Sequence, residues 1–374
     1  MWDELTSAAP LACAGCRGLA VDGMRKVAAP LVLADHGFFW VGVMREERAY
    51  GLAAAGQMFV QYQIPAEQRH ALPVVMVHGG GGQGLDYLGT PDGRPGWADF
   101  FLRRGHAVYV VDRTALGRSP YHPDLHGPLG PPPSYGFMRG RFVAPELTPD
   151  AYPQAGRHTQ WPGGTEIGDP VLDQFMAGQG PSVADLGRVH ADMRRCAAAL
   201  LDRIGPAVLI THSAGGPFGW LAADARPSLV RGIVAVEPQG PAFAETPGGA
   251  LAWGLTAVPL AYDPPAAAPQ DLACAPLKAP RPDLQDCLVQ AEPARSLPNL
   301  RDCPVAVVTG EASWKAQQDH GVVAFLRQAG VPAEHLRLEE HGLRGNGHMM
   351  MIERNSDEIA ELLATWIERK TAIA

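Results

Sequence analysis

Apolar runs and amphipathic stretches alternate along most of the chain, and this alternation predicts an α/β fold. Continuous apolar runs are typical of strands that are buried on both faces of a parallel sheet. We predict strands at residues 31–43, 58–62, 74–77, 106–111, 207–211, 232–236, 304–308 and 335–338. The two that come first in the chain are expected to be antiparallel and to lie at one edge of the sheet.

Segments with helical periodicity separate these strands. We predict helices at residues 97–104, 182–204 and 315–328, directly after residue 213, and from residue 355 onward. The last of them has the apolar spacing of a helix packed on a sheet, with Ile359, Leu362, Leu363, Trp366 and Ile367 along one stripe. Alternating strands and helices favour a doubly wound, mostly parallel central sheet with helices on both faces.

Two long segments interrupt this alternation. Residues 113–180 are rich in proline, glycine and aromatic residues, and we expect an irregular insertion over the carboxyl edge of the sheet. Residues 240–300 are rich in alanine, proline and leucine, and we expect a cap or lid. The predicted organisation is therefore an N-terminal extension at 1–28, a core at 29–239 and 301–374, and a cap insertion at 240–300.

Composition and charge narrow the partners and the location. The 374 residues are 46% hydrophobic and 19% charged, with a net charge of −8 and no basic cluster, which argues against nucleic acid binding. No apolar run is long enough to span a bilayer. Asp3, Glu4 and Pro10 make the N-terminus a poor secretory signal, so a cytoplasmic location is expected. The sequence does not give the oligomeric state, and a homodimer stays open.

The six cysteines leave the redox compartment open. Cys13 and Cys16 form a C-x-x-C without the second pair that a zinc site requires, so an N-terminal surface segment is expected there. Cys274 and Cys287 flank a proline-rich stretch, which suits a disulfide. Such a bridge would indicate a secreted or periplasmic protein.

A serine follows one of the predicted strands at a sharp turn. The apolar run 207–211 leads into Ser213, and a helix with Pro217 in its first turn follows. This arrangement is typical of a nucleophile elbow, in which small residues let the strand and the helix pass closely. Thr211 replaces the first glycine of the usual G-x-S-x-G pattern. Ser213 is the predicted nucleophile.

A serine nucleophile requires a base and an acid that orients the base. His348 is the predicted base because glycines flank it between the last strand and the last helix, whereas His341 lacks such a turn. Glu237 is the predicted acid because it ends an apolar strand, where an unpaired carboxylate would be costly to bury. Glu311 is the second choice. The more usual acid position falls near Ser313.

A glycine-rich run, residues 78–84, follows the strand at 74–77. The backbone N–H of Gly80 or Gly81, together with that of Ala214, is predicted to form an oxyanion hole. The same run also satisfies G-x-G-x-x-G, so a dinucleotide-binding protein with Asp112 as the ribose acid is a distant alternative. Two strands precede the run, however, and Asp112 comes later than that motif prefers.

Together these segments resemble the α/β-hydrolase superfamily over most of residues 55–370. The resemblance rests on His78-Gly79-Gly80, on residues 111–119, on the elbow at Ser213 and on Gly347-His348. It implies a structural role for Asp112. Through residues 90–97 the chain is most similar to an atypical group of bacterial carboxylesterases. That group is known for a Ser–Glu–His triad, and its glutamate maps onto Glu237.

The sequence thus predicts a serine carboxylic-ester hydrolase. Its substrates are expected to be small to medium-sized, largely apolar esters, cleaved through an acyl-enzyme without a cofactor or metal. Amidase, thioesterase and carbon–carbon hydrolase activities use the same triad and stay open as alternatives. A non-catalytic, ligand-binding relative of these enzymes is a further alternative.

Overall fold

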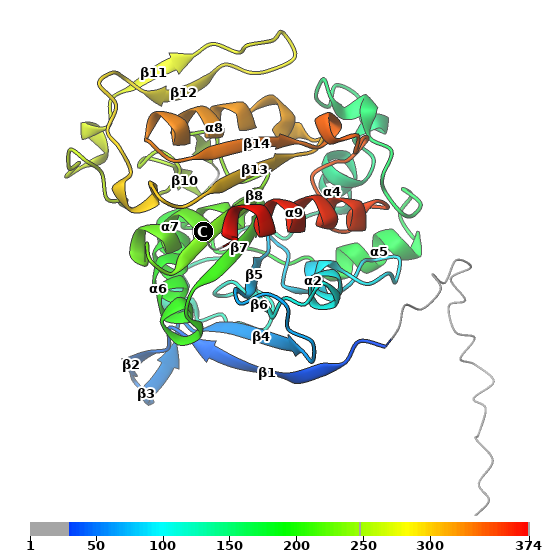
Figure 1. Ribbon diagram of the computed structural model, residues 1–374, viewed down its shortest axis with the longest axis horizontal. Coiled ribbons are helices and arrows are strands. Elements are labelled where there is room, and N and C mark those ends of the chain that lie inside the picture. The colour runs from blue at the N-terminus through cyan, green and yellow to red at the C-terminus, as the bar shows by residue number, and fades with distance from the viewer. Residues whose placement is uncertain (1–29, 247, 373–374) are drawn as a thin grey trace, which may run out of the picture. The chain divides into compact units, whose positions relative to one another are not determined.

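A mostly parallel sheet of eight strands forms the centre of the fold (Figure 1). The computed structural model describes residues 30–246 and 248–372, so the predicted extension at 1–28, with Cys13 and Cys16, lies outside the described residues. The strand order is β1-β4-β6-β5-β7-β8-β13-β14. The strands are β1 (Leu33–Val41), β4 (Met58–Pro65), β5 (Val74–Val77), β6 (Val108–Asp112), β7 (Ala207–His212), β8 (Val230–Val236), β13 (Val305–Thr309) and β14 (Ala333–Arg337).

The antiparallel part of the sheet lies at the edge that the sequence predicts. β1 pairs with β4 and β4 with β6 in antiparallel register, whereas the strands from β6 to β14 are parallel to one another. The predicted strand at 31–43 is followed by a separate hairpin, β2 (Met44–Arg48) and β3 (Gly51–Ala55), which the sequence analysis did not anticipate.

Two apolar cores cover the two faces of the sheet. Along β5, Val75 and Val77 belong to one core and Val74 and Met76 to the other, as the alternation of strand side chains requires. The first core includes residues of α6 (Leu186–Ile204), α7 (Gly216–Ala225) and α8 (Asp319–Gln328). The second includes residues of α2 (Trp97–Arg104), α5 (Pro170–Ala177) and α9 (Ser356–Thr371). Helices therefore cover both faces, and the predicted doubly wound fold is confirmed.

The final helix packs through the predicted stripe. In α9, Ile359, Leu363, Trp366 and Ile367 are buried, whereas Leu362 is only partly buried at the margin of the same core. Figure 1 shows α9 beside α2 on this face of the sheet. No helix in the described ranges is long and apolar enough to cross a membrane.

Residues 113–180 consist of short helices joined by irregular chain. Met138, Val143 and Trp161 anchor this insertion in the second core, because all three are buried there. Its elements are α3 (Pro123–His126), α4 (Tyr135–Met138), the π-helix η1 (Arg139–Val143), η2 (Pro145–Leu147), η3 (Ala155–Arg157) and α5.

Residues 240–300 contain little regular structure. They hold the small sheets β9 (Glu245–Thr246) with β10 (Gly249–Ala250) and β11 (Cys274–Leu277) with β12 (Cys287–Gln290), and the short helix η5 (Pro269–Asp271). Trp253, Leu255, Leu260 and Tyr262 are buried in the first core. The function of residues 240–300 as a cap stays a prediction.

The predicted disulfide between Cys274 and Cys287 is wrong. In the antiparallel register of β11 and β12, Cys274 faces Gln290 and Cys287 faces Leu277, so the two cysteines are not paired across the strands. Both thiols are free; Cys274 is exposed and Cys287 is buried. The disulfide therefore provides no argument for an oxidising compartment.

Candidate active site

Ser213 lies at the turn between β7 and α7, with the backbone in the left-handed region at a φ of +52°. Non-glycine residues rarely adopt this conformation, and where they do it is frequently at functional sites. The turn needs small neighbours, because a Cβ at Gly215 would lie 2.3 Å from the carbonyl oxygen of His78. Thr211, in place of the usual glycine, is fully buried, and its Cγ2 would be at an ordinary contact distance of 3.6 Å from a Cβ added at Gly219.

The loop between β14 and α9 brings His348 onto this serine. Nε2 of His348 lies 2.9 Å from Oγ of Ser213, and Nδ1 lies 2.5 Å from Oε2 of Glu237. The imidazole is 3% exposed. The structure thus brings the predicted nucleophile, base and acid into one hydrogen-bonded row.

Glu237 follows β8 and is fully buried. Oε1 accepts from the N–H of Gly310 at 2.7 Å, and Oε2 accepts from Oγ of Ser313 at 2.5 Å as well as from His348. Burial raises the pKa of Glu237 to about 8, although the hydrogen bonds from Ser313 and Gly310 and the charge of Lys315 act in the opposite direction. The hydrogen-bond donors around Glu237 therefore favour the carboxylate, whereas burial favours the neutral acid.

The competing candidates lie outside this row. Glu311 accepts from Arg344 at 3.0 Å and from the N–H of Gly345 at 3.1 Å, so it supports the histidine loop from the outside. His341 is exposed at the end of η8 (Leu338–His341). Ser313, at the more usual acid position, donates to Glu237.

The glycine run and the elbow meet at Gly80 and Ala214. A Cβ added at Gly80 would lie 3.3 Å from Cβ of Ala214. The N–H of Gly81, in contrast, already donates to Oγ of Ser182 at 3.1 Å. In this arrangement Gly80 and Ala214 remain the candidate oxyanion donors, and Gly81 serves to hold the run in place.

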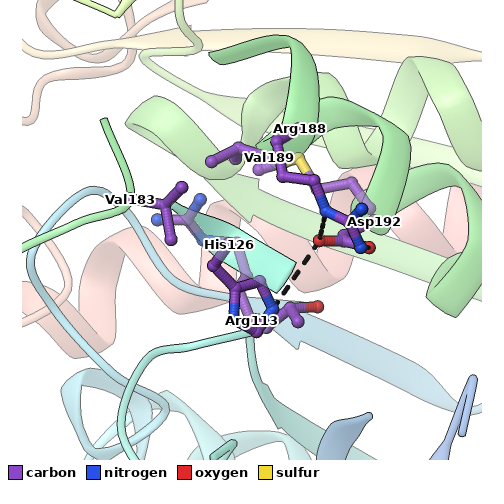
Figure 2. A pocket seen from close by; sticks show the side chains of 8 residues that line it. Arg113, His126, Val183, Arg188, Val189 and Asp192 are labelled. Atoms are coloured by element: carbon purple, nitrogen blue, oxygen red, sulfur yellow. Dashed lines mark hydrogen bonds and ion pairs between the residues drawn. The ribbon is translucent and has the colours of Figure 1, made fainter. Parts of the chain in front are cut away.

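Arg113 also connects the same two segments, a role for which the sequence gives no signal. Its guanidinium donates to the carbonyl oxygens of Gly79 at 2.6 Å and Ala214 at 3.4 Å, and its N–H donates to His78. Arg113 also lines a cavity of about 10 Å³ that adjoins Asp192 (Figure 2). This space suits a single water and is too small for a substrate.

The dinucleotide alternative loses its acid in this structure. Asp112 accepts from the N–H of Gly84 at 2.6 Å and from Nε of Arg118 at 2.7 Å. Its carboxylate therefore fixes two turns of the protein rather than facing a ribose. The helix after the glycine run, α1 (Leu85–Leu88), is only four residues long.

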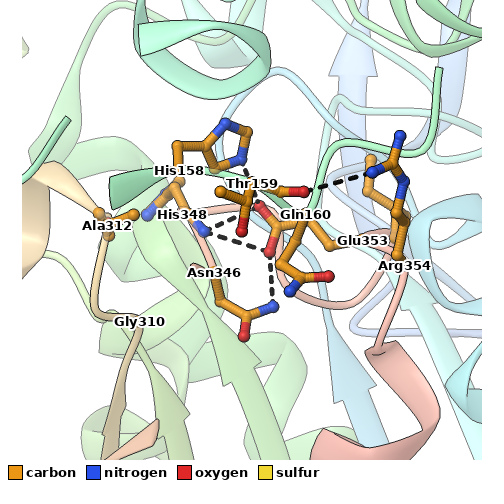
Figure 3. Close-up of polar contacts among 12 residues, drawn as sticks. His158, Thr159, Gln160, Gly310, Ala312, Asn346, His348, Glu353 and Arg354 are labelled. Atoms are coloured by element: carbon orange, nitrogen blue, oxygen red, sulfur yellow. Dashed lines mark hydrogen bonds and ion pairs between the residues drawn. The ribbon is translucent and has the colours of Figure 1, made fainter. Parts of the chain in front are cut away.

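A second buried carboxylate holds the loop that carries His348 (Figure 3). Glu353 accepts from Asn346 at 2.8 Å and from the N–H of Gly347 at 2.9 Å, and it lies 3.1 Å from Nε2 of His158. Nδ1 of His158 lies 3.2 Å from Glu146. His158 thus ties the insertion at 113–180 to the histidine loop. The sequence gives no signal for the contact between His158 and Glu353, because the two residues are far apart in the chain.

The carboxylates of Glu353 and Glu146 raise the pKa of His158, so the stability of the fold should depend on pH. Burial lowers the pKa of His158, but the hydrogen bond and charge of Glu353 and the charge of Glu146 outweigh it, so the pKa is raised. Protonated His158 therefore stabilises the fold below the ordinary imidazole pKa of about 6.5, and this contribution is lost as pH rises through the raised value. We expect the difference in Tm between wild type and His158→Gln to shrink as pH rises from about 6 to about 9.

Thermal unfolding across this pH range measures the effect. His341→Gln, at an exposed position, controls for the general pH dependence of Tm. A difference between wild type and His158→Gln that grows with rising pH would contradict the assignment.

Comparisons with known proteins identify the family to which this fold belongs. A family model described as alpha/beta hydrolase fold matches residues 73–273. A protein of Fungal sp. (strain ATCC 74256), described as a probable secreted lipase phiG, is 40% identical over 344 residues, which cover 89% of each chain. The solved structure of a novel bacterial esterase superposes with a TM-score of 0.64 at 24% identity, over 92% of this chain and 98% of the other, and shows the shared fold. The chain therefore belongs to the alpha/beta hydrolase family.

Proposed function

We propose that the protein is a serine carboxylic-ester hydrolase that acts through an acyl-enzyme on small to medium-sized, largely apolar esters. The observation that carries this proposal is the hydrogen-bonded row from Oγ of Ser213 through His348 to Glu237. The descriptions of the fungal relative as a lipase and of the bacterial structure as an esterase support ester hydrolysis.

The geometry suggests how the reaction proceeds. Nε2 of His348 takes the proton of Ser213 as Oγ attacks the ester carbonyl, and Glu237 holds the Nδ1–H and stabilises the imidazolium. The N–H groups of Gly80 and Ala214 donate to the oxyanion of the tetrahedral intermediate. His348 then gives the proton to the departing alcohol, which leaves the acyl group on Ser213. Water, activated by His348, cleaves the acyl-enzyme in the reverse sequence of steps.

The surroundings of the serine favour a substrate of limited size. Ser213 is half-buried, and the rings of Phe142 and Trp314 lie against His348 with centroids 5.2 and 5.6 Å away. A cavity of about 190 Å³ adjoins the glycine run at Gly81 and Gln83, but neither Ser213 nor His348 lines it.

Covalent labelling tests the nucleophile. A fluorophosphonate is expected to modify Ser213, because its hydroxyl contacts an imidazole whose other nitrogen faces a buried carboxylate. Mass spectrometry of the digested protein locates the label. Ser228→Ala, at an exposed serine, should be labelled like the wild type. Modification of another residue, or an active enzyme that is not labelled, would refute the proposal.

The compartment and the assembly state are separate questions. The cytoplasmic location and the homodimer stay predictions from the sequence. The description of the fungal relative as secreted favours secretion instead.

A further inference from the structure

Two aromatic side chains enclose the imidazole, and one of them belongs to the π-helix η1. Phe142 stacks on His348 at an interplanar angle of 25°, and Trp314 approaches it at 47°. π-Helices are rare and occur frequently at functional sites. The local irregularity of η1 therefore lies where the 113–180 insertion contacts the catalytic row.

Arg141, the residue before Phe142, places a positive charge beside the second of these aromatic side chains, Trp314. The guanidinium carbon of Arg141 lies 4.0 Å from the centroid of the Trp314 ring, so a single ring separates this charge from the imidazole. Arg141 is half-buried, and within residues 30–246 and 248–372 it has neither a hydrogen bond nor an ion pair. Its neighbour Arg139, in contrast, is paired with Glu166.

The charge of Arg141 reaches the reaction centre. Burial lowers the pKa of His348, and the charges of Lys315 and Arg141 lower it further. Lys315 forms an ion pair with Asp319 at 3.2 Å. Of these two cations only Arg141 lacks a carboxylate partner among the described residues. Partly burying a cation without a counter-charge costs free energy, which a bound anion would recover.

We propose that Arg141 binds a carboxylate of the substrate, so that the preferred substrates are esters that carry a free carboxylate. This inference rests on the proposed esterase function, and it replaces the largely apolar esters named there with esters that carry one anionic group. A guanidinium matches a carboxylate with two parallel hydrogen bonds, and stacking on Trp314 fixes the plane in which it does so. The partly desolvated position strengthens the attraction. The carboxylate belongs either to the acyl part or to the alcohol part of the ester.

Two matched pairs of substrates distinguish a carboxylate on the acyl part of the ester from one on the alcohol part. Monomethyl glutarate and dimethyl glutarate differ by a carboxylate on the acyl side, and 4-acetoxybenzoate and its methyl ester differ by one on the alcohol side. The measured quantity is the ratio of kcat/KM for the anionic member to kcat/KM for the neutral member. We expect the wild type to favour the anionic member of one pair and Arg141→Gln to lower that ratio by about tenfold or more.

Arg139→Gln is the matched control, because it removes a nearby positive charge that is already paired. It should leave the ratio close to that of the wild type, whereas Arg141→Glu should lower the ratio further than Arg141→Gln. A merely structural role of Arg141 would lower both members of a pair equally and so overturn the proposal. A wild type that favours the neutral member of both pairs would also overturn it. Fluorophosphonate labelling of the same preparation reports on the esterase function itself, so the two failures are distinguishable.

Discussion

Ser213→Ala is expected to lower kcat by about a millionfold while the protein remains folded. The substitution removes only Oγ, the atom that lies 2.9 Å from Nε2 of His348. No other group among the described residues forms a hydrogen bond with this nitrogen. The Cβ that alanine keeps already tolerates the positive φ of this turn, so the backbone needs no new conformation. Loss of the nucleophile leaves only binding and the oxyanion donors to accelerate the reaction.

The measurement is the steady-state hydrolysis of p-nitrophenyl butyrate, with circular dichroism and Tm as checks on folding. Ser228→Ala again serves as the control, and it should retain wild-type turnover because the residue is exposed. A folded Ser213→Ala protein that kept more than about a hundredth of the activity would show that another group attacks the ester.

The sequence carried enough information to predict Ser213, His348 and Glu237 because each follows an element with a strong local pattern. Ser213 ends a buried strand and begins a helix, His348 follows glycines before an amphipathic helix, and Glu237 ends an apolar run. In a parallel sheet, the carboxyl ends of neighbouring strands lie at one edge. Local signals plus this one topological rule were therefore sufficient to place them together; their catalytic roles stay proposals.

Features that depend on long-range contacts were not predictable in the same way. Arg113, His158 and Glu353 acquire their partners only when distant segments pack together, and no pattern in the sequence specifies those partners. The disulfide failed because strand register, not sequence spacing, decides whether Cys274 and Cys287 face each other. The proposal of Gly80 rather than Gly81 as an oxyanion donor likewise rests on Ser182, a residue from another segment.

Glu237→Gln is expected to lower kcat by about 10⁴-fold, whereas Glu311→Gln should lower it by less than about tenfold. The amide of glutamine can present a donor to Nδ1 of His348, which favours the tautomer with its proton on Nε2. That tautomer cannot accept the proton of Ser213. Among the described residues, Glu311 accepts hydrogen bonds from Arg344 and the N–H of Gly345, so its loss loosens the loop without changing the imidazole. Steady-state kinetics of both variants measure the difference, and a loss confined to Glu311→Gln would identify Glu311 as the acid.

Ser313 offers a sharper version of this test. Its Oγ lies 2.5 Å from Oε2 of Glu237, so a carboxylate at position 313 is within reach of the same imidazole. In wild type, Ser313→Asp would place two carboxylates together and should reduce activity, because like charges at this distance repel. Combined with Glu237→Gln, the same Ser313→Asp should restore part of the lost kcat. Restored activity would show that catalysis depends on a carboxylate at Nδ1 of His348 rather than on the strand that supplies it. A double variant no more active than Glu237→Gln would instead mean that the geometry at Glu237 is itself required.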